Sequence, residues 1–199
     1  MTVPTQEIRV SLNIPNMLTG LRVALSFVVA WLLLQGTEAS ILAAGIVLVC
    51  AALTDWADGY LARRMGHASL FGSLFDVCAD QFLFMPALIL SVHAGLFDRA
   101  AGFMFWNPYP YAVLTLAGGV TVLAGVIVFL IKRQKQDIEF PTPPMLVKVN
   151  YWFWIAPLIL AVFKIGPDLL LAILMYTAIV TTLMSIYTYL KKGSYVFTD

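Results

Sequence analysis

Residues 70–94 read LFGSLFDVCADQFLFMPALILSVHA, a stretch whose only Asp, Glu, Lys or Arg residues are Asp76 and Asp80. A helix needs about 20 predominantly apolar residues to cross the hydrocarbon core of a bilayer, so this stretch predicts a transmembrane helix. Acidic side chains inside such a helix are costly and usually have a function. The stretch therefore predicts a membrane fold and a site built on it.

Five further stretches have the length and apolar character of membrane spans. Together with the first, the six are placed at residues 16–35, 39–63, 70–94, 108–131, 146–164 and 168–190. They lack the period-two alternation of barrel strands, so we predict an all-α bundle of six transmembrane helices. Because the connections are short, residues 1–199 are expected to form a single membrane domain. A short amphipathic segment, Glu7 to Asn13, is expected at the membrane surface before the first helix.

The composition agrees with a membrane protein. Of the 199 residues, 61% are hydrophobic and 12% are charged, and the mean hydropathy is +0.88. These values lie well outside the range of soluble domains. The net charge is only +1, and no basic stretch is interleaved with aromatic residues, which excludes a nucleic-acid partner.

Three smaller features are interpreted as structural rather than functional. Cys50 and Cys78 both lie in apolar stretches and are expected to be free, small packing residues rather than a disulfide. The consecutive Gly118 and Gly119 are interpreted as a site of close helix packing. The aromatic run at residues 151–154 is interpreted as a lipid-facing belt near the membrane surface.

Basic residues predict the orientation in the membrane. Only Arg99 and Lys164 fall at one end of the expected bundle, and the positive-inside rule puts the other end in the cytoplasm. We therefore expect a multi-pass protein of the cell (inner) membrane, with both termini and the acidic residues at the cytoplasmic face. The basic residues at that face are Arg9, Arg22, Arg63, Arg64, Lys132, Arg133, Lys135, Lys148, Lys191 and Lys192.

Two pairs of carboxylates lie in the second and third predicted spans. Spacings of three and four residues put the members of each pair on one helix face. Carboxylates that share a buried site repel one another unless cations hold them ionised, and hard oxygen ligands favour Mg²⁺ or Mn²⁺. The alternative is a small transporter that uses the carboxylates as ion-pair or proton-relay groups, although the chain shows no internal repeat of broken helices. The four residues are Asp55, Asp58, Asp76 and Asp80.

These aspartates belong to a longer pattern. Residues 55–63 read DWADGYLAR, eight residues follow, and residues 72–80 read GSLFDVCAD. The pattern resembles the signature of CDP-alcohol phosphotransferases at all eight specified positions. The resemblance implies an enzyme that transfers a phosphatidyl group from CDP-diacylglycerol to an alcohol and releases CMP. It also implies a homodimer. The eight positions are Asp55, Asp58, Gly59, Ala62, Arg63, Gly72, Asp76 and Asp80.

The resemblance also implies roles for these residues. The four aspartates would bind two Mg²⁺ or Mn²⁺ ions, and Asp80 would in addition be the general base. Two such ions can neutralise a pyrophosphate and align the reacting oxygens. Gly72 would either let the ligand approach the helix closely or let two helices pack closely together. The residues implied to contact the CDP-lipid are Asp58, Gly59, Ala62, Arg63, Ser69 and Gly72.

The first predicted span begins with residues 13–22, NIPNMLTGLR, which are similar to the start of bacterial phosphatidylglycerophosphate synthases and cardiolipin synthases. Asn16, Thr19 and Arg22 share one helical stripe, which we expect to face the bundle interior. Asn16 and Thr19 are further predicted contacts of the CDP-lipid. The alternative is an interfacial helix start with Arg22 reaching to the membrane surface.

The predicted acceptor is a small, phosphorylated alcohol, most simply glycerol 3-phosphate, whose phosphate needs fixed cations near Asp80. The alternative explanation for most of the candidate basic residues is that they only set the orientation of the protein in the membrane. Gln81 and Val147 depart from phosphatidylglycerophosphate synthases, which usually have lysine and glycine there. Inositol phosphate, serine, a polyol phosphate and phosphatidylglycerol therefore remain alternative acceptors. The candidate cations are Lys148, Arg133, Lys135, Lys132 and Arg22.

Overall fold

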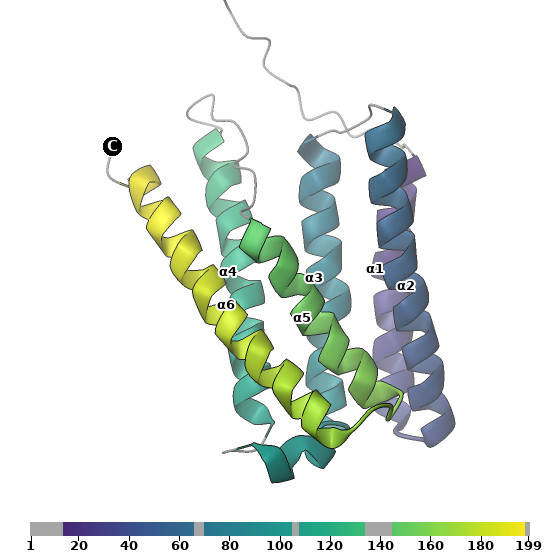
Figure 1. Ribbon diagram of the computed structural model, residues 1–199. Coiled ribbons are helices and arrows are strands. Elements are labelled where there is room, and N and C mark those ends of the chain that lie inside the picture. Colours follow the sequence, from purple (N-terminus) through teal and green to yellow (C-terminus); the bar gives the residue numbers. More distant parts are fainter. Residues whose placement is uncertain (1–13, 66–69, 105–107, 134–144, 198–199) are drawn as a thin grey trace, which may run out of the picture.

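The computed structural model describes residues 14–65, 70–104, 108–133 and 145–197, and these are almost entirely helical (Figure 1). The prediction of an all-α fold is confirmed. The six α-helices of this part lie close to the predicted spans, except that the last one continues beyond residue 190. The predicted amphipathic segment, Glu7 to Asn13, lies outside the described residues. The helices are α1 (Ile14–Gln35), α2 (Glu38–Met65), α3 (Leu70–His93), the 3-10 helix η1 (Asp98–Phe103), α4 (Tyr109–Arg133), α5 (Met145–Val162) and α6 (Asp168–Phe197).

The α-helices run alternately up and down the bundle (Figure 1). On one side, α1 packs against both α2 and α3, and on the other, α6 packs against α4 and α5. Contacts of α3 with α4 and α5, and of α2 with α5, join the two sides. The starts of α1, α3 and α5 therefore lie at the same end as the last turns of α2, α4 and α6. We call this the upper end, as it appears in Figure 1.

Within the described residues, four helices are long and apolar enough to cross a membrane: Met17–Gln35, Leu74–His93, Tyr109–Val128 and Asp168–Thr188. The apolar parts of α2 and α5 are shorter, at Glu38–Thr54 and Asn150–Val162. The predicted count of six spans is therefore not confirmed. The side chains that follow Thr54 in α2 and those that precede Asn150 in α5 lie outside the described ones.

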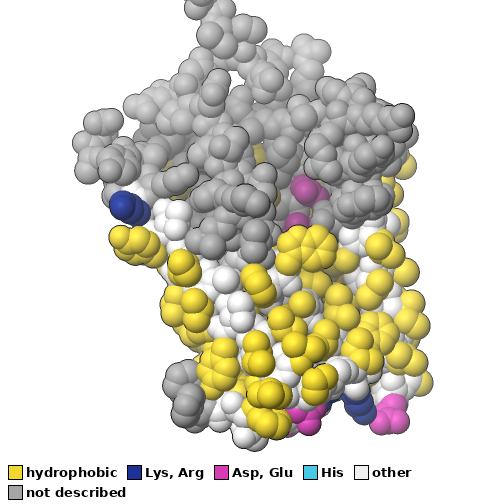
Figure 2. All heavy atoms as spheres, in the orientation of Figure 1, with side chains coloured by type: hydrophobic (Ala, Val, Ile, Leu, Met, Phe, Trp, Pro, Cys, Tyr) yellow, Lys and Arg dark blue, Asp and Glu magenta, His cyan; other side chains and the backbone are white. Residues whose placement is uncertain are grey.

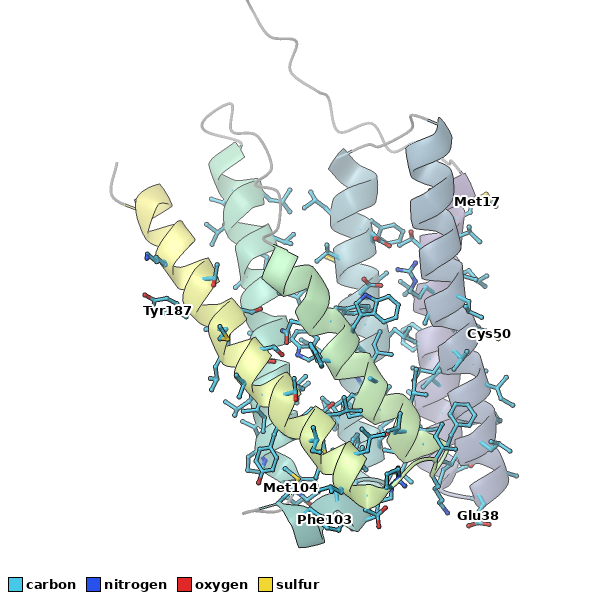
Figure 3. All side chains as sticks on the ribbon, viewed as in Figure 1. Met17, Glu38, Cys50, Phe103, Met104 and Tyr187 are labelled. Atoms are coloured by element: carbon cyan, nitrogen blue, oxygen red, sulfur yellow. The ribbon has the colours of Figure 1, made fainter. Side chains whose placement is uncertain are left out.

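The outer surface of the bundle is apolar. Figure 2 shows hydrophobic side chains over most of its described middle, and Met17 and Tyr187 point away from the helices (Figure 3). Such a surface suits lipid, whose tails are equally apolar. Both cysteines are free, as predicted, but Cys50 lies exposed on this surface rather than in the packing. The chain is a multi-pass helical membrane protein.

Trp154 lies in the bundle core. It is 3% exposed, its ring stacks on Phe84 with centroids 5.4 Å apart, and its indole N–H donates to Thr182 Oγ1 at 2.8 Å. The interpretation of residues 151–154 as a lipid-facing belt is therefore wrong for Trp154. Trp152, in contrast, is 66% exposed and faces outward. The core fits around Trp154 because Gly118 carries no side chain there: a Cβ would come within 2.9 Å of the indole ring.

Candidate functional site

The polar stripe of α1 faces the bundle interior, as predicted. Thr19 is 3% exposed and Arg22 is 1% exposed, whereas the side chain of Asn16 lies outside those the structure describes. Ser26 extends the stripe: it is buried, and its hydroxyl donates to the carbonyl oxygen of Val23 at 2.6 Å. The alternative, in which Arg22 reaches to the membrane surface, is wrong because its guanidinium group has partners inside the bundle.

Those partners are two of the predicted metal ligands. Arg22 Nη1 donates to Asp76 Oδ1 at 2.8 Å and to Asp80 Oδ1 at 2.6 Å. The two carboxylates lie one turn apart on α3, as their spacing of four residues predicts. Bonds between a guanidinium and carboxylates are among the strong, charge-assisted kind. The contact joins α1 to α3, two helices that pack directly against each other.

The two carboxylates lie where the buried core meets accessible space. The side chain of Asp76 is 40% exposed and that of Asp80 is 18% exposed, against 1% for Arg22. Figure 2 shows acidic side chains here in the upper half of the bundle, separate from those at the lower edge. The guanidinium thus covers the inner side of the pair. A ligand can approach the carboxylates from the accessible side.

Several other predicted site residues have a described backbone only. The end of α2 and the start of α3 carry most of the signature, and the end of α4 and the start of α5 carry three of the basic candidates, so all of them belong to the upper end. Convergence of the four carboxylates stays a prediction. Ser69 and Lys135 lie outside the described residues. The positions whose side chains are not described are Asp55, Asp58, Gly59, Ala62, Arg63, Lys132, Arg133 and Lys148.

The described carboxylates are the kind of donor that hard divalent cations prefer. Among the described side chains, no group of three or more His, Cys, Asp or Glu residues could hold a metal ion, because only two of the four predicted ligands are among them. Asp76 and Asp80 nevertheless turn one oxygen each towards the same cationic nitrogen. Carboxylate oxygens gathered around one positive charge are the hard donors that Mg²⁺ and Mn²⁺ prefer.

Gln81, the residue after Asp80, packs into the seam between α3 and α4. It is 5% exposed, and a Cβ on Gly119 would lie 2.5 Å from its Oε1. Within the described part of the chain, this buried Oε1 has no hydrogen-bond partner. The sequence marked Gln81 only as a departure from related enzymes. The structure adds that Gly119 makes the space for this carboxamide in the seam between α3 and α4.

The pairing of Arg22 with Asp76 and Asp80 was not predicted, since Arg22 was assigned to an acceptor phosphate. A signal for the pairing was present in the sequence. A charged residue deep in an apolar helix needs an opposite charge, because an unpaired buried charge is very costly. The acidic residues of the second and third spans were the candidate partners.

The fold and the site define a class: a helical membrane protein with a buried arginine and a pair of carboxylates near one end of its bundle. Residues 12–184 match the CDP-alcohol phosphatidyltransferase family. Because this match covers most of the chain, the protein belongs to that family.

Individual relatives point the same way. The CDP-diacylglycerol–glycerol-3-phosphate 3-phosphatidyltransferase of Pseudomonas fluorescens is 43% identical over 105 residues, which cover 52% of this chain and 49% of that protein. The protein of the same name from Bacillus subtilis is 36% identical over 104 residues, or 46% of this chain and 52% of the relative. The protein of the same name from Escherichia coli K12 is 43% identical over 79 residues, which cover 39% of this chain and 43% of the relative. The matched stretch thus spans about half the length of these relatives.

Proposed function

We propose that the chain is a phosphatidyltransferase that uses CDP-diacylglycerol and glycerol 3-phosphate. The family and the names of the relatives support the reaction. The observation that carries the proposal is the pair of carboxylates, Asp76 and Asp80, arranged around the guanidinium of Arg22. Their hydrogen bonds to Arg22 Nη1 measure 2.8 and 2.6 Å. In the reaction, the acceptor hydroxyl oxygen bonds to the phosphorus that carries diacylglycerol. The bond from this phosphorus to the bridging oxygen breaks, CMP leaves with that oxygen, and the hydroxyl loses its proton.

The chain's own residues take up distinct roles in this proposal. Asp80 accepts the proton of the attacking hydroxyl, and it is the more buried of the two described carboxylates. Bound Mg²⁺ or Mn²⁺, two ions per site, would neutralise charge on the pyrophosphate. The ligands of the ions are Asp55, Asp58, Asp76 and Asp80. The CDP-lipid contacts are Asp58, Gly59, Ala62, Arg63, Ser69, Gly72, Asn16 and Thr19.

The phosphate of the acceptor needs cations at the upper end. Because Arg22 is 1% exposed and bonded to two carboxylates, we assign it to those carboxylates rather than to the acceptor. Lys148 is the first choice for the phosphate because it lies within an apolar run, where a charge without a partner would be costly. The other choices are Arg133, Lys135 and Lys132. Inositol phosphate, serine and phosphatidylglycerol are the alternative acceptors.

The membrane setting belongs to the same proposal. All six helices cross the bilayer: α2 has 28 residues and α5 has 18, against the roughly 17–25 that a span needs. The positive residues at the upper end support a cytoplasmic active site in the inner membrane, with both termini on that side. Two copies form a homodimer, as the family resemblance implies.

Release of labelled CMP tests the proposal. Purified protein in detergent receives CDP-diacylglycerol labelled in the cytidine and Mn²⁺, and each acceptor is added singly. We expect CMP release and a phosphatidylglycerol phosphate product with glycerol 3-phosphate, and neither when EDTA removes the ion. CMP release with a different acceptor would change only the assignment of the acceptor and would leave the reaction class standing. No release with any acceptor, together with ion flux in liposomes, would favour the transporter.

A further inference from the structure

Arg22 takes the place of a cation between two carboxylates that are proposed metal ligands. We propose that Arg22 is a positioning residue: a built-in counter-ion that holds Asp76 and Asp80 together in the ion-free protein and competes with divalent ions for the same oxygens. This inference rests on the proposed function, because it takes both aspartates as metal ligands.

The geometry makes Arg22 a substitute for an ion. A single nitrogen, Nη1, donates to one oxygen of each carboxylate, at 2.8 Å for Asp76 and 2.6 Å for Asp80. A guanidinium nitrogen carries two N–H groups in a planar, fixed arrangement, so it fixes the spacing of the two oxygens as well as neutralising them. The two aspartates repel each other without such a charge. Arg22 therefore prepares their arrangement before any ion is bound.

The position of Arg22 also determines how the ion and the arginine interact. The guanidinium is 1% exposed and lies on the inner side, whereas the carboxylates are 40% and 18% exposed. An ion that arrives from the accessible side meets the same Oδ1 atoms and a positive charge directly behind them. Two cations at such short range repel strongly where water is scarce. Arg22 therefore weakens the binding of divalent ions at the same time as it orders their ligands.

The sign of this effect separates the proposal from a purely structural role. If Arg22 only packed α1 against α3, its loss would disorder the site and weaken ion binding. If Arg22 competes with the ion, its loss removes a repulsive charge and tightens ion binding. Activity falls in both cases and does not distinguish them, so the affinity for the ion is the informative measurement.

The test compares Mn²⁺ binding to the full chain in detergent, followed by electron paramagnetic resonance without substrate. For Arg22→Gln we expect a dissociation constant lower by roughly tenfold, from the loss of one nearby positive charge, and reduced CMP release. Arg22→Lys keeps the charge and is expected to bind Mn²⁺ like the wild type. Ser26→Ala is the matched control, because Ser26 lies one turn away on the same buried stripe and its described hydrogen bond, to Val23, stays within its own helix.

Two outcomes contradict different statements. An Arg22→Gln protein that is folded by gel filtration and thermal melting, yet binds Mn²⁺ no more tightly than the wild type, overturns the inference and leaves the proposed reaction standing. A wild type that binds no Mn²⁺ and releases no CMP overturns the proposed function, and the inference with it.

A measurement on the wild type covers the case in which Arg22→Gln does not fold. Nitrogen-15 labelling of the arginines allows the side-chain signals to be followed during titration with diamagnetic Mg²⁺, and the signal missing from Arg22→Lys identifies Arg22. The proposal expects the Arg22 Nη signals to shift as Mg²⁺ saturates the site. Signals that stay in place at saturation overturn it.

Discussion

Gly119 of α4 lies directly against Gln81 of α3, so closely that a Cβ on the glycine would lie 2.5 Å from Gln81 Oε1. The neighbouring Gly118 lies against Trp154 and Thr182, at 2.9 and 2.7 Å from the position of its missing Cβ. Two consecutive glycines thus allow α4 to approach α3 on one side and α5 and α6 on the other. This seam keeps the carboxamide of Gln81, the residue that follows Asp80 in the sequence, buried.

Gly118→Ala is expected to destabilise the bundle by about 1–3 kcal/mol, because the methyl group would overpack against an indole ring and a β-branched threonine. Gly119→Ala should cost less, since its closest contacts are the flexible ends of Gln81 and Met85. Gly125→Ala is the control: nothing lies within 4 Å of its added Cβ. Thermal unfolding in detergent measures all three. A Gly118→Ala protein as stable as Gly125→Ala would contradict the packing described here.

Trp154→Phe is expected to lower stability by about 1–3 kcal/mol, through the lost hydrogen bond to Thr182 and the smaller ring. Trp152→Phe is the matched control because Trp152 is 66% exposed, and it should unfold almost as the wild type does. Indole fluorescence gives a second readout, since only the Trp154→Phe protein should lose emission from a buried indole. Equal unfolding temperatures for the two variants would place Trp154 outside the core.

The positions of the helices could be predicted from sequence because long apolar runs have few other stable structures in a membrane. The count of membrane spans was harder to predict. The predicted span 39–63 contains Asp55, Asp58 and Arg63, so the residues that mark the site also lower the hydropathy of the helix that carries them. A membrane span is predicted from apolar residues and a site inside it from charged residues, so the two predictions weaken each other.

The details of the site depended on helix register, which sequence alone does not contain. The stripe of Thr19 and Arg22 was predictable because their spacing places them on one face. Which carboxylates Arg22 meets depends on how far α1 is shifted along α3, and this shift follows from packing over the whole interface. In the same way, nothing in the run of residues 151–154 indicates that the ring of Trp154 faces inward and that of Trp152 faces outward.

Arg99→Ala is expected to loosen the turn between α5 and α6 and to lower stability by about 1–3 kcal/mol. The guanidinium of Arg99 donates to the carbonyl oxygens of Leu160, Ile165 and Gly166 and to Asp168, at 2.8–3.3 Å. Lys164→Ala is the control, because it removes only an exposed ion pair with Glu38 and should have little effect. Hydrogen exchange at residues 160–168, read by mass spectrometry, should rise in Arg99→Ala alone. Equal exchange in the two variants would show that the turn is stabilised by its own backbone rather than by the side chain of Arg99.

Asp80→Asn is expected to abolish CMP release, because the amide has lost the negative charge that accepts the proton of the attacking hydroxyl. Ion-dependent binding of the CDP-lipid should partly persist, since the remaining aspartates and an amide oxygen still offer ligands. Asp76→Asn provides the comparison: it too loses the charge that faces Arg22, but it keeps the proposed base, so added Mn²⁺ should restore part of its activity. Filter binding of labelled CDP-diacylglycerol and the CMP assay measure the two properties separately. Full turnover by Asp80→Asn would exclude Asp80 as the base, and loss of lipid binding together with turnover would indicate that its role is to hold the ion.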